Sequence, residues 1–380
     1  MDAVNNAWET QMIRLRERVD NGSPEWAAKF LGALVPSITY SRVIPAVEEL
    51  MQILTTSDDF AVTNAVADLL AEIAPQLAED ANSHLCILIV AFVERESHGV
   101  LEGMHGTDCL DAAIRVMAAL APNLEPDQVD RSADIAEKLL LKPSDPFAVA
   151  AGAEITVALA MTLTAQQVDD IAMACTTTLK QSKDRLELEA SCNAIIALAP
   201  RLSSEQVTSA WDAVIDRLRE SEDDWHSRDE LAAALAALVP SVGQDQITWA
   251  GDAAINMTAK AEHSWQVDAA GAMLVAIQSH ISQPQFARAA DTFIATMNST
   301  NDSNFRFHAR ERLIGVAPQL TPLQRQKTLE VLLPELERYY EFEYPFYELV
   351  ALLQLSGPQD SAGHATTVQV YSSTTSESEC

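Results

Sequence analysis

The sequence predicts an all-α fold built from stacked helix pairs that repeat about every 39 residues. An apolar run that ends in proline recurs at near-constant spacing, a helix-capping pattern often follows it, and the segments between have helical apolar periodicity. The recurrent anchor positions are Pro36, Pro75, Pro122, Met161, Pro200, Pro240, Ser279 and Pro318. Their spacings of 39, 47, 39, 39, 40, 39 and 39 residues indicate an array of about eight to nine repeats.

The first helix of each repeat is predicted from its cap. Ser203 and Gln206 form a capping box, in which each side chain bonds the backbone N–H of the other residue. The same pair recurs as Thr164 with Gln167, Ser282 with Gln285, and Thr321 with Gln324. Gln128 and Gln246 have Glu125 and Gly243 in place of the hydroxyl residue, so we expect weaker caps there.

The second helix of the repeat is predicted over about residues 227–239. It is rich in Ala and Leu, so neighbouring elements should cover it on more than one side, and Pro240 ends it. A large apolar residue recurs near its start: Phe60, Phe147, Leu186, Trp225, Trp265 and Phe305. Because large apolar side chains are usually buried, we interpret these residues as core anchors.

Two such helices cannot bury their apolar faces alone, so neighbouring pairs must stack. The unit, with its period, proline stop and apolar pattern, resembles the HEAT and Armadillo-like bihelical repeats over residues 1–355. The resemblance implies a right-handed α-solenoid whose inner face commonly holds other proteins, and it carries over no functional residue. Residues 356–380 are polar and rich in Ser and Thr, which predicts a disordered tail.

The charge balance restricts the class of partner. The chain has 25 basic and 55 acidic residues, and its net charge of −30 repels nucleic acids and anionic membranes. Protein partners with basic surfaces are more compatible. The start of the sequence has no secretory pattern, and its five cysteines are typical of reduced thiols. We therefore expect a cytoplasmic protein, or one in a host cytoplasm if it is a secreted effector.

The spacing between Pro75 and Pro122 is 8 residues longer than the usual period, which predicts an insertion loop near residues 94–109. Such a loop either stays solvated or contacts a partner. His98, Glu102 and His105 are its candidate partner-binding residues. With Asp108 and Cys109 they are also possible metal ligands, but their spacing matches no zinc motif, so no metal is predicted.

An acidic residue recurs twelve positions after most anchors: Glu48, Asp134, Asp212, Asp252, Asp291 and Glu330. Asp is unfavourable inside a helix, so its repeated use needs a reason. Either each carboxylate bonds the adjacent repeat, or the acids form a ridge for a basic ligand. On the second interpretation the partner-binding candidates are Asp134, Asp212, Asp252 and Asp291.

Two further clusters have alternative interpretations. Arg306, His308, Arg310 and Arg312 bind acids either of a neighbouring repeat or of a partner. Tyr339, Tyr340 and Tyr344 either cap the last core layer or form a binding hot spot.

The sequence has no catalytic motif, so it favours a non-enzymatic scaffold without a cofactor that binds partner proteins on its curved surface. The alternatives are an enzyme, or an accessory to one, that uses a cleft and the 94–109 loop, and the repeat region of a secreted bacterial effector.

Overall fold

The computed structural model describes residues 2–17, 24–34, 37, 40–57, 59–101, 107–142, 145–220, 225–328 and 330. The chain divides into two compact units, Met1–Val316 and Ala317–Cys380. The first unit contains sixteen described α-helices, and no strand occurs in the part of the chain listed above. The prediction of an all-α fold is confirmed.

The α-helices of the first unit form eight successive pairs, one pair per repeat. They are α1 (Asp2–Glu17) with α2 (Pro24–Leu34), α3 (Tyr40–Thr56) with α4 (Phe60–Ile73), α5 (Glu79–Leu101) with α6 (Thr107–Leu120), α7 (Pro126–Leu140) with α8 (Pro146–Leu159), α9 (Ala165–Gln181) with α10 (Arg185–Leu198), α11 (Ser204–Glu220) with α12 (Trp225–Leu238), α13 (Gln244–Ala259) with α14 (Ser264–Ala276), and α15 (Gln283–Ser299) with α16 (Ser303–Val316).

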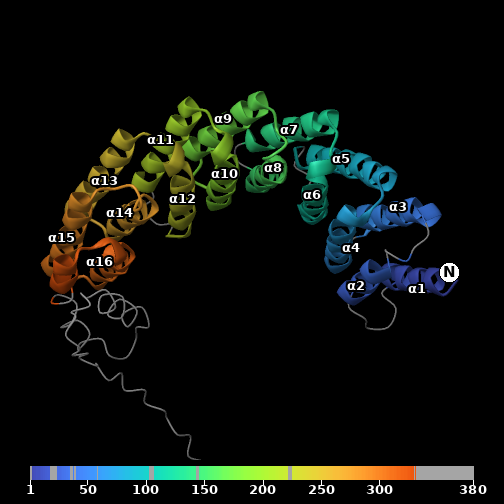
Figure 1. Cartoon of the computed structure of the whole chain (residues 1–380), viewed down its shortest axis with the longest axis horizontal. Coiled ribbons are helices and arrows are strands. Elements are labelled where there is room, and N and C mark those ends of the chain that lie inside the picture. The colour runs from blue at the N-terminus through green and yellow to red at the C-terminus, as the bar shows by residue number, and fades with distance from the viewer. Residues whose placement is uncertain are drawn as a thin grey trace, which may run out of the picture. The chain divides into compact units, whose positions relative to one another are not determined.

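The pairs of the first unit stack in two layers (Figure 1). Even-numbered helices contact their even-numbered neighbours from α2 through to α16 and form the layer on the inner side of this unit. Odd-numbered helices form the outer layer. Trp211 and Val214 of α11 and Leu231 of α12 are completely buried, as expected for two apolar helix faces that cover each other.

The anchor prolines end the inner helices through a short 3₁₀ turn. Pro75, Pro122, Pro200 and Pro240 lie at the first turn of η3 (Ala74–Gln76), η4 (Ala121–Asn123), η5 (Ala199–Arg201) and η6 (Val239–Ser241). Proline has no N–H to continue an α-helix, but its fixed φ suits the start of a new helical turn. The chain then extends into the cap of the next outer helix.

The predicted capping boxes are present. The backbone N of Thr164 donates to Oε1 of Gln167 at 2.7 Å, and the backbone N of Gln167 donates to Oγ1 of Thr164 at 3.3 Å. Ser203 and Gln206 make the same two bonds at 2.7 and 3.4 Å. In the second unit Thr321 and Gln324 repeat them at 2.8 and 3.4 Å, before a helical segment over residues 322–328.

Two expectations need correction. The stretch 94–109 is mostly helical, because α5 continues to Leu101 and α6 starts at Thr107, so the surplus residues lengthen a helix. The proposed core anchors at the starts of inner helices are not buried: Phe60, Phe147 and Leu186 are 60, 50 and 43% exposed. Trp265 and Phe305 are half-buried, and the side chain of Trp225 lies outside the described residues.

Candidate functional site

The predicted acidic residues lie in the outer layer of the first unit. Asp134 is on α7, Asp212 on α11, Asp252 on α13 and Asp291 on α15, one per helix. Asp134, Asp212 and Asp291 are exposed, and Asp252 is half-buried. The register in the sequence therefore corresponds to a row on the outer layer, which is interrupted at α9, where Met173 has this position.

Asp252 bonds the next repeat. Its Oδ1 accepts from Nε2 of Gln285 at 3.1 Å and lies 2.5 Å from Nη2 of Arg288, both on α15. Glu48 of α3 likewise lies 3.1 Å from Nε2 of His84 on α5. At these two positions the carboxylate links adjacent outer helices. This agrees with the interpretation that the recurrent acid bonds the adjacent repeat.

His98 and Asp134 line the same small cavity between α5 and α7. The cavity has a volume of about 70 Å³ and is also lined by Ser97, Arg131 and Lys138. This is room for little more than a water molecule or a small ion. No group of three or more His, Cys, Asp or Glu side chains suited to a metal ion occurs among the described residues. Glu102, His105, Tyr339, Tyr340 and Tyr344 lie outside those residues.

A second row of carboxylates follows the inner layer. We call it the inner acidic row: Asp68 of α4, Asp111 of α6, Glu154 of α8, Glu189 of α10 and Asp229 of α12. Asp111, Glu189 and Asp229 lie eleven residues before their anchors, and Asp68 and Glu154 lie seven before theirs. Positions four apart share one helix face, so five consecutive inner helices each present an acid on the same side.

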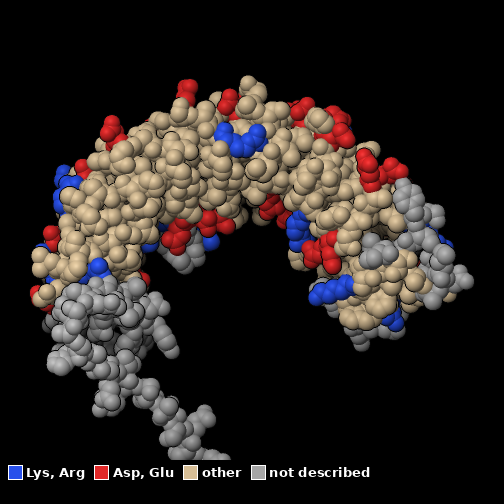
Figure 2. Space-filling model, viewed as in Figure 1, with Lys and Arg blue, Asp and Glu red and all other residues tan. Residues whose placement is uncertain are grey.

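Two of these carboxylates, Asp111 and Glu154, are close enough to affect each other. Burial and the charge of Asp111 raise the pKa of Glu154 to about 7, although Arg115 opposes the shift. Nη1 of Arg115 lies 3.7 Å from Oδ1 of Asp68, and Arg115 also donates to Asn64. Acidic side chains are visible on the inner side of this unit as well as on its outer side (Figure 2). The row therefore contributes negative charge to the inner layer, and Arg115 and Arg312 offset part of it at Asp68 and Asp229.

On α14 the register of the row continues, but the acid there is neutralised. Asp268 lies eleven residues before Ser279 and is 5% exposed. Its Oδ2 is 2.9 Å from Nη1 of Arg228 on α12, and its Oδ1 is 2.9 Å from Nε of Arg312 and 3.2 Å from Nδ1 of His308, both on α16. Three consecutive repeats therefore meet at one carboxylate.

Burial by itself raises the pKa of Asp268, but hydrogen bonds from His308, Arg312 and Arg228, together with the charge of Arg312, bring that pKa well below its usual range. Of the two interpretations of the basic α16 segment, Arg312 and His308 follow the first: they bind an acid of a neighbouring repeat. Neither Asp268 as their partner nor the inner acidic row was predicted from the sequence. The sequence signal that could have revealed them is the acidic residue inside the Ala- and Leu-rich second helix of the repeat.

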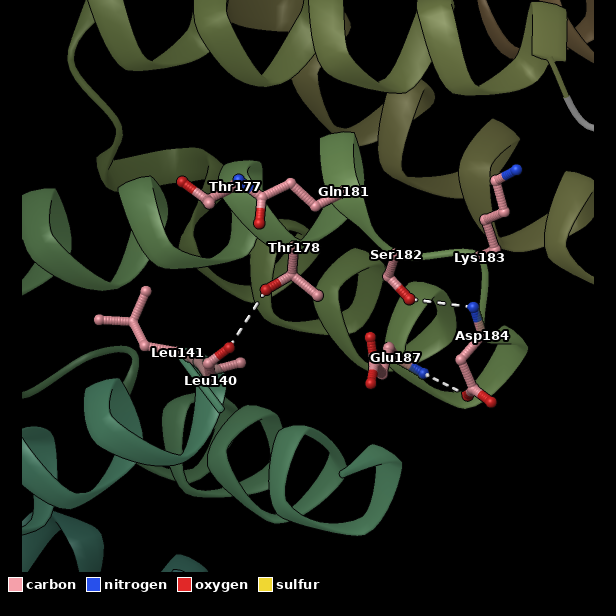
Figure 3. Close-up of a pocket in the computed structure, with 9 residues that line it drawn as sticks. All are labelled: Leu140, Leu141, Thr177, Thr178, Gln181, Ser182, Lys183, Asp184 and Glu187. Atoms are coloured by element: carbon pink, nitrogen blue, oxygen red, sulfur yellow. Dashed lines mark hydrogen bonds between the residues drawn. The ribbon is translucent and has the colours of Figure 1, made fainter. Parts of the chain in front are cut away.

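A larger cavity of about 480 Å³ opens between the fourth and fifth repeats (Figure 3). Leu140 and Leu141 at the end of α7 form one wall, and the end of α9 forms another. The hydroxyl of Thr178 donates to the carbonyl of Leu140 at 3.1 Å and joins the two walls. Asp184 and Glu187, at the start of α10, close the far side.

The buried thiols are unreactive. Burial raises the pKa of Cys86 to about 11 and that of Cys175 to about 12. Thiolate is the nucleophilic form, so neither side chain is activated at neutral pH.

Among the helices that the structure describes, none is long and apolar enough to cross a membrane.

The stacked pairs, the 3₁₀ proline turns and the two-layer arrangement define a HEAT-like α-solenoid. Solved structures with this architecture include the karyopherin Kap121p bound to the extreme C-terminus of the protein phosphatase Cdc14p, with a TM-score of 0.56 and 15% identity over 92% of this chain and 38% of that one. Kap121p bound to Nup53p has a TM-score of 0.56 and 15% identity over 90% of this chain and 37% of the other. Kap121p bound to the SUMO protease Ulp1p has the same TM-score and identity over 92% and 37%.

The chain thus spans well under half the length of the structures it resembles. At 15% identity the resemblance establishes the fold alone. The sequence matches no protein-family model and no curated protein.

Proposed function

We propose that this chain is a non-enzymatic scaffold that binds a basic segment of a partner protein along the inner acidic row. The observation that carries the proposal is the regular placement of Asp68, Asp111, Glu154, Glu189 and Asp229, one carboxylate on each of five consecutive inner helices. Such a row has a repeat of about 10 Å, the distance between packed helices. An extended chain with Lys or Arg side chains at intervals matches this spacing.

The pKa of Glu154 supports the proposal. A carboxylate whose pKa is raised to about 7 by partial desolvation and by a neighbouring acid is destabilised in its charged form. A cation from a partner stabilises the charged forms of Glu154 and Asp111 and offsets their mutual repulsion, which favours binding. Nucleic acid and anionic membranes cannot do this, because they add negative charge to a chain of net charge −30.

Solved neighbours with this fold are bound to proteins, namely the extreme C-terminus of Cdc14p, Nup53p and Ulp1p. This supports a protein as the ligand class. The outer row of Asp134, Asp212, Asp252 and Asp291 is the competing surface. Acids of both rows are engaged within the chain: Asp252 by Arg288 and Gln285 in the outer row, and Asp68 by Arg115 and Asp229 by Arg312 in the inner row. The inner row is favoured because it continues over five consecutive inner helices, whereas the outer row is interrupted at α9, which has Met173 at this position.

The test compares matched charge reversals. The inner variant is Glu154→Lys with Glu189→Lys, and the outer control is Asp134→Lys with Asp212→Lys. The net charge of both variants changes equally. Binding of a fluorescent Lys/Ser peptide is measured by anisotropy at about 50 mM and about 500 mM salt, since screening separates electrostatic from apolar contributions.

We expect the inner variant to weaken binding at low salt by roughly tenfold and the control by less than about twofold, because effects of exposed charges are local and modest. Equal losses of peptide affinity in both variants would mean that only the net charge of the chain determines binding, and would refute a specific inner site. Weaker binding in the control alone would assign the partner to the outer row.

A further inference from the structure

The exposed apolar residues on the inner helices recur in register. Phe60 begins α4, and Phe147 and Leu186 lie in the first turns of α8 and α10. They precede their anchors by 15, 14 and 14 residues and are 60, 50 and 43% exposed. We call them the inner apolar row. Scattered exposed apolar residues need no explanation, but Phe147 and Leu186 have the same position on the adjacent inner helices α8 and α10 and so form a shared surface, while Phe60 lies two inner helices away.

The inner apolar row runs beside the inner acidic row. On α10 Glu189 follows Leu186 by three residues, and on α8 Glu154 follows Phe147 by seven, spacings that keep both side chains on one helix face. On α4 Asn64 and Asp68 follow Phe60 by four and eight residues. Each of these helices therefore presents an apolar side chain at its start and a carboxylate one to two turns later.

The large cavity lies where the outer helices α7 and α9 end, next to the start of the inner helix α10. Asp184 and Glu187, which flank Leu186 in the sequence, line it together with Leu140 and Leu141. Its position between repeats, with an apolar wall on the α7 side and carboxylates on the α10 side, is visible in Figure 3. A volume of about 480 Å³ is within the range of ordinary ligand pockets and accommodates a side chain.

We propose that the partner segment is an extended peptide that combines apolar and basic residues, with its apolar side chains against Phe147, Leu186 and the adjoining cavity and its Lys or Arg side chains on Glu154 and Glu189. This inference rests on the proposed function and adds apolar contacts to the charge pairs that recognise the partner. The helices α8 and α10 are in contact, so their axes are about 8–10 Å apart. In a polyproline II conformation, with three residues per turn and about 3.1 Å per residue, apolar side chains three residues apart lie on the same side of the peptide and about 9 Å apart, which bridges the two helices.

Charge complementarity selects this occupant over others. A second copy of the chain also has a net charge of −30 and is repelled. The chain's own residues 356–380 include Asp360, Glu377 and Glu379 but no Lys or Arg, so they do not complement the acids. An anionic lipid surface offers apolar contacts but is repelled by the adjacent carboxylates. A basic and apolar protein segment satisfies both rows.

The experiment uses two labelled peptides with the same length and the same number of lysines. One has serines between the lysines, and in the other two of those serines, three residues apart, are leucines. The variant Phe147→Ser with Leu186→Ser tests the apolar row. The control is Met161→Ser with Met173→Ser, which removes side chains that are 83 and 64% exposed at the α8–α9 turn and on the outer helix α9. Circular dichroism melts verify that all variants fold.

We expect the full-length chain to bind the leucine peptide roughly tenfold more tightly than the serine peptide, as burial of part of two Leu side chains implies. The Phe147 and Leu186 variant should lose this advantage and still bind the serine peptide, while the control keeps it. Equal affinities for the two peptides, or the same loss in the control, would overturn the inference.

The outcomes separate this inference from the proposed function. If the serine peptide binds and responds to Glu154→Lys with Glu189→Lys, but leucine adds nothing, only the present inference fails. If neither peptide responds to these acid reversals, the proposed function fails with it. A leucine advantage that survives Phe147→Ser with Leu186→Ser would place the apolar contacts elsewhere and refute the assignment.

Discussion

Nε of Arg312 lies 2.9 Å from Oδ1 of Asp268, although the two residues are 44 positions apart on adjacent inner helices. The approach depends on Gly271, one turn after Asp268 on α14. A Cβ at position 271 would lie 2.1 Å from Cγ and 2.3 Å from Cβ of Arg312. These are the atoms of the arginine nearest the backbone, so the side chain cannot swing away without leaving Asp268.

Gly271→Ala is therefore expected to destabilise the solenoid. Overpacking a fitted contact costs about 1–3 kcal/mol, and the displaced guanidinium also loses its carboxylate. Urea unfolding of the full chain, followed by circular dichroism, measures the loss as a lower midpoint.

The control is Gly243→Ala at the start of α13. There the added Cβ meets Gln246 at 3.8 Å, an ordinary contact, so the midpoint should stay nearly unchanged. An unchanged midpoint for Gly271→Ala would show that Arg312 does not need the close approach.

Asp268→Asn should lower stability at neutral pH and have less effect in acid. Breaking a buried ion pair costs about 3–5 kcal/mol, because the arginines remain buried without their counter-ion. The folded-state pKa of Asp268 is below the unfolded value of about 3.9, so its contribution is complete above about pH 4 and is lost as the pH falls further. Unfolding midpoints at several pH values between 7 and 3 test this.

Asp212→Asn is the matched comparison, since Asp212 is exposed on α11. It should change stability by less than about 0.5 kcal/mol at any pH. If the difference in unfolding midpoint between wild type and Asp268→Asn stayed constant down to pH 3, it would contradict the assigned role of the ionised carboxylate.

The fold was predictable from the sequence because its signals are local. The capping box of Thr164 and Gln167 involves residues three apart, and the proline turns follow directly from the missing N–H. The register was also sufficient to place Asp134, Asp212, Asp252 and Asp291 in one row. The periodicity of the apolar residues could not predict which of their side chains are exposed. Whether Phe147 is buried depends on how neighbouring repeats cover its edge, and the expectation of a core anchor was wrong.

The Asp268 cluster needed information between repeats. Arg228 and Asp268 are 40 residues apart, one period, and Asp268 and Arg312 are 44 apart. In a stacked array, residues one period apart are neighbours, so a charge comparison between successive inner helices would have found these pairs. Charge clusters within a single repeat do not include these pairs, because their members belong to different repeats. The inner acidic row was overlooked for the same reason.

Gln167→Ala tests whether the capping glutamines also join repeats. Nε2 of Gln167 donates to Oδ1 of Asp130 on α7 at 2.7 Å, while its Oε1 accepts from the backbone of Thr164 at 2.7 Å. Losing both the cap and the link should cost about 1–2 kcal/mol. Thermal unfolding measures the change.

Gln166→Ala is the neighbouring control. Gln166 donates to Asp170 within the same helix at 3.0 Å, and it contributes to neither the cap nor the link to α7. Its loss should cost less than about 0.5 kcal/mol. Equal effects of the two substitutions would indicate that helix propensity, rather than the link to α7, accounts for the loss.

Glu154→Gln tests the pH dependence of the proposed binding. Since burial and Asp111 raise the pKa of Glu154 to about 7, this side chain is largely protonated at pH 6 and ionised at pH 8. Binding of the Lys/Ser peptide should therefore strengthen from pH 6 to pH 8, by roughly three- to tenfold if one additional charge pair of about 1 kcal/mol forms. Titrations by fluorescence anisotropy at constant ionic strength provide the measurement.

The same pKa has the opposite consequence for stability. The folded chain binds the proton of Glu154 more tightly than the unfolded chain, whose glutamates titrate near 4.3, so the contribution of this group to stability falls as the pH rises from about 4.5 to 7. Glu154→Gln should remove that decline and also flatten the pH dependence of peptide binding. A variant that flattens neither would show that the proton is held elsewhere. If the variant changes only the stability profile, the peptide does not contact Glu154, and the basic side chains of the partner must lie on other acids of the row.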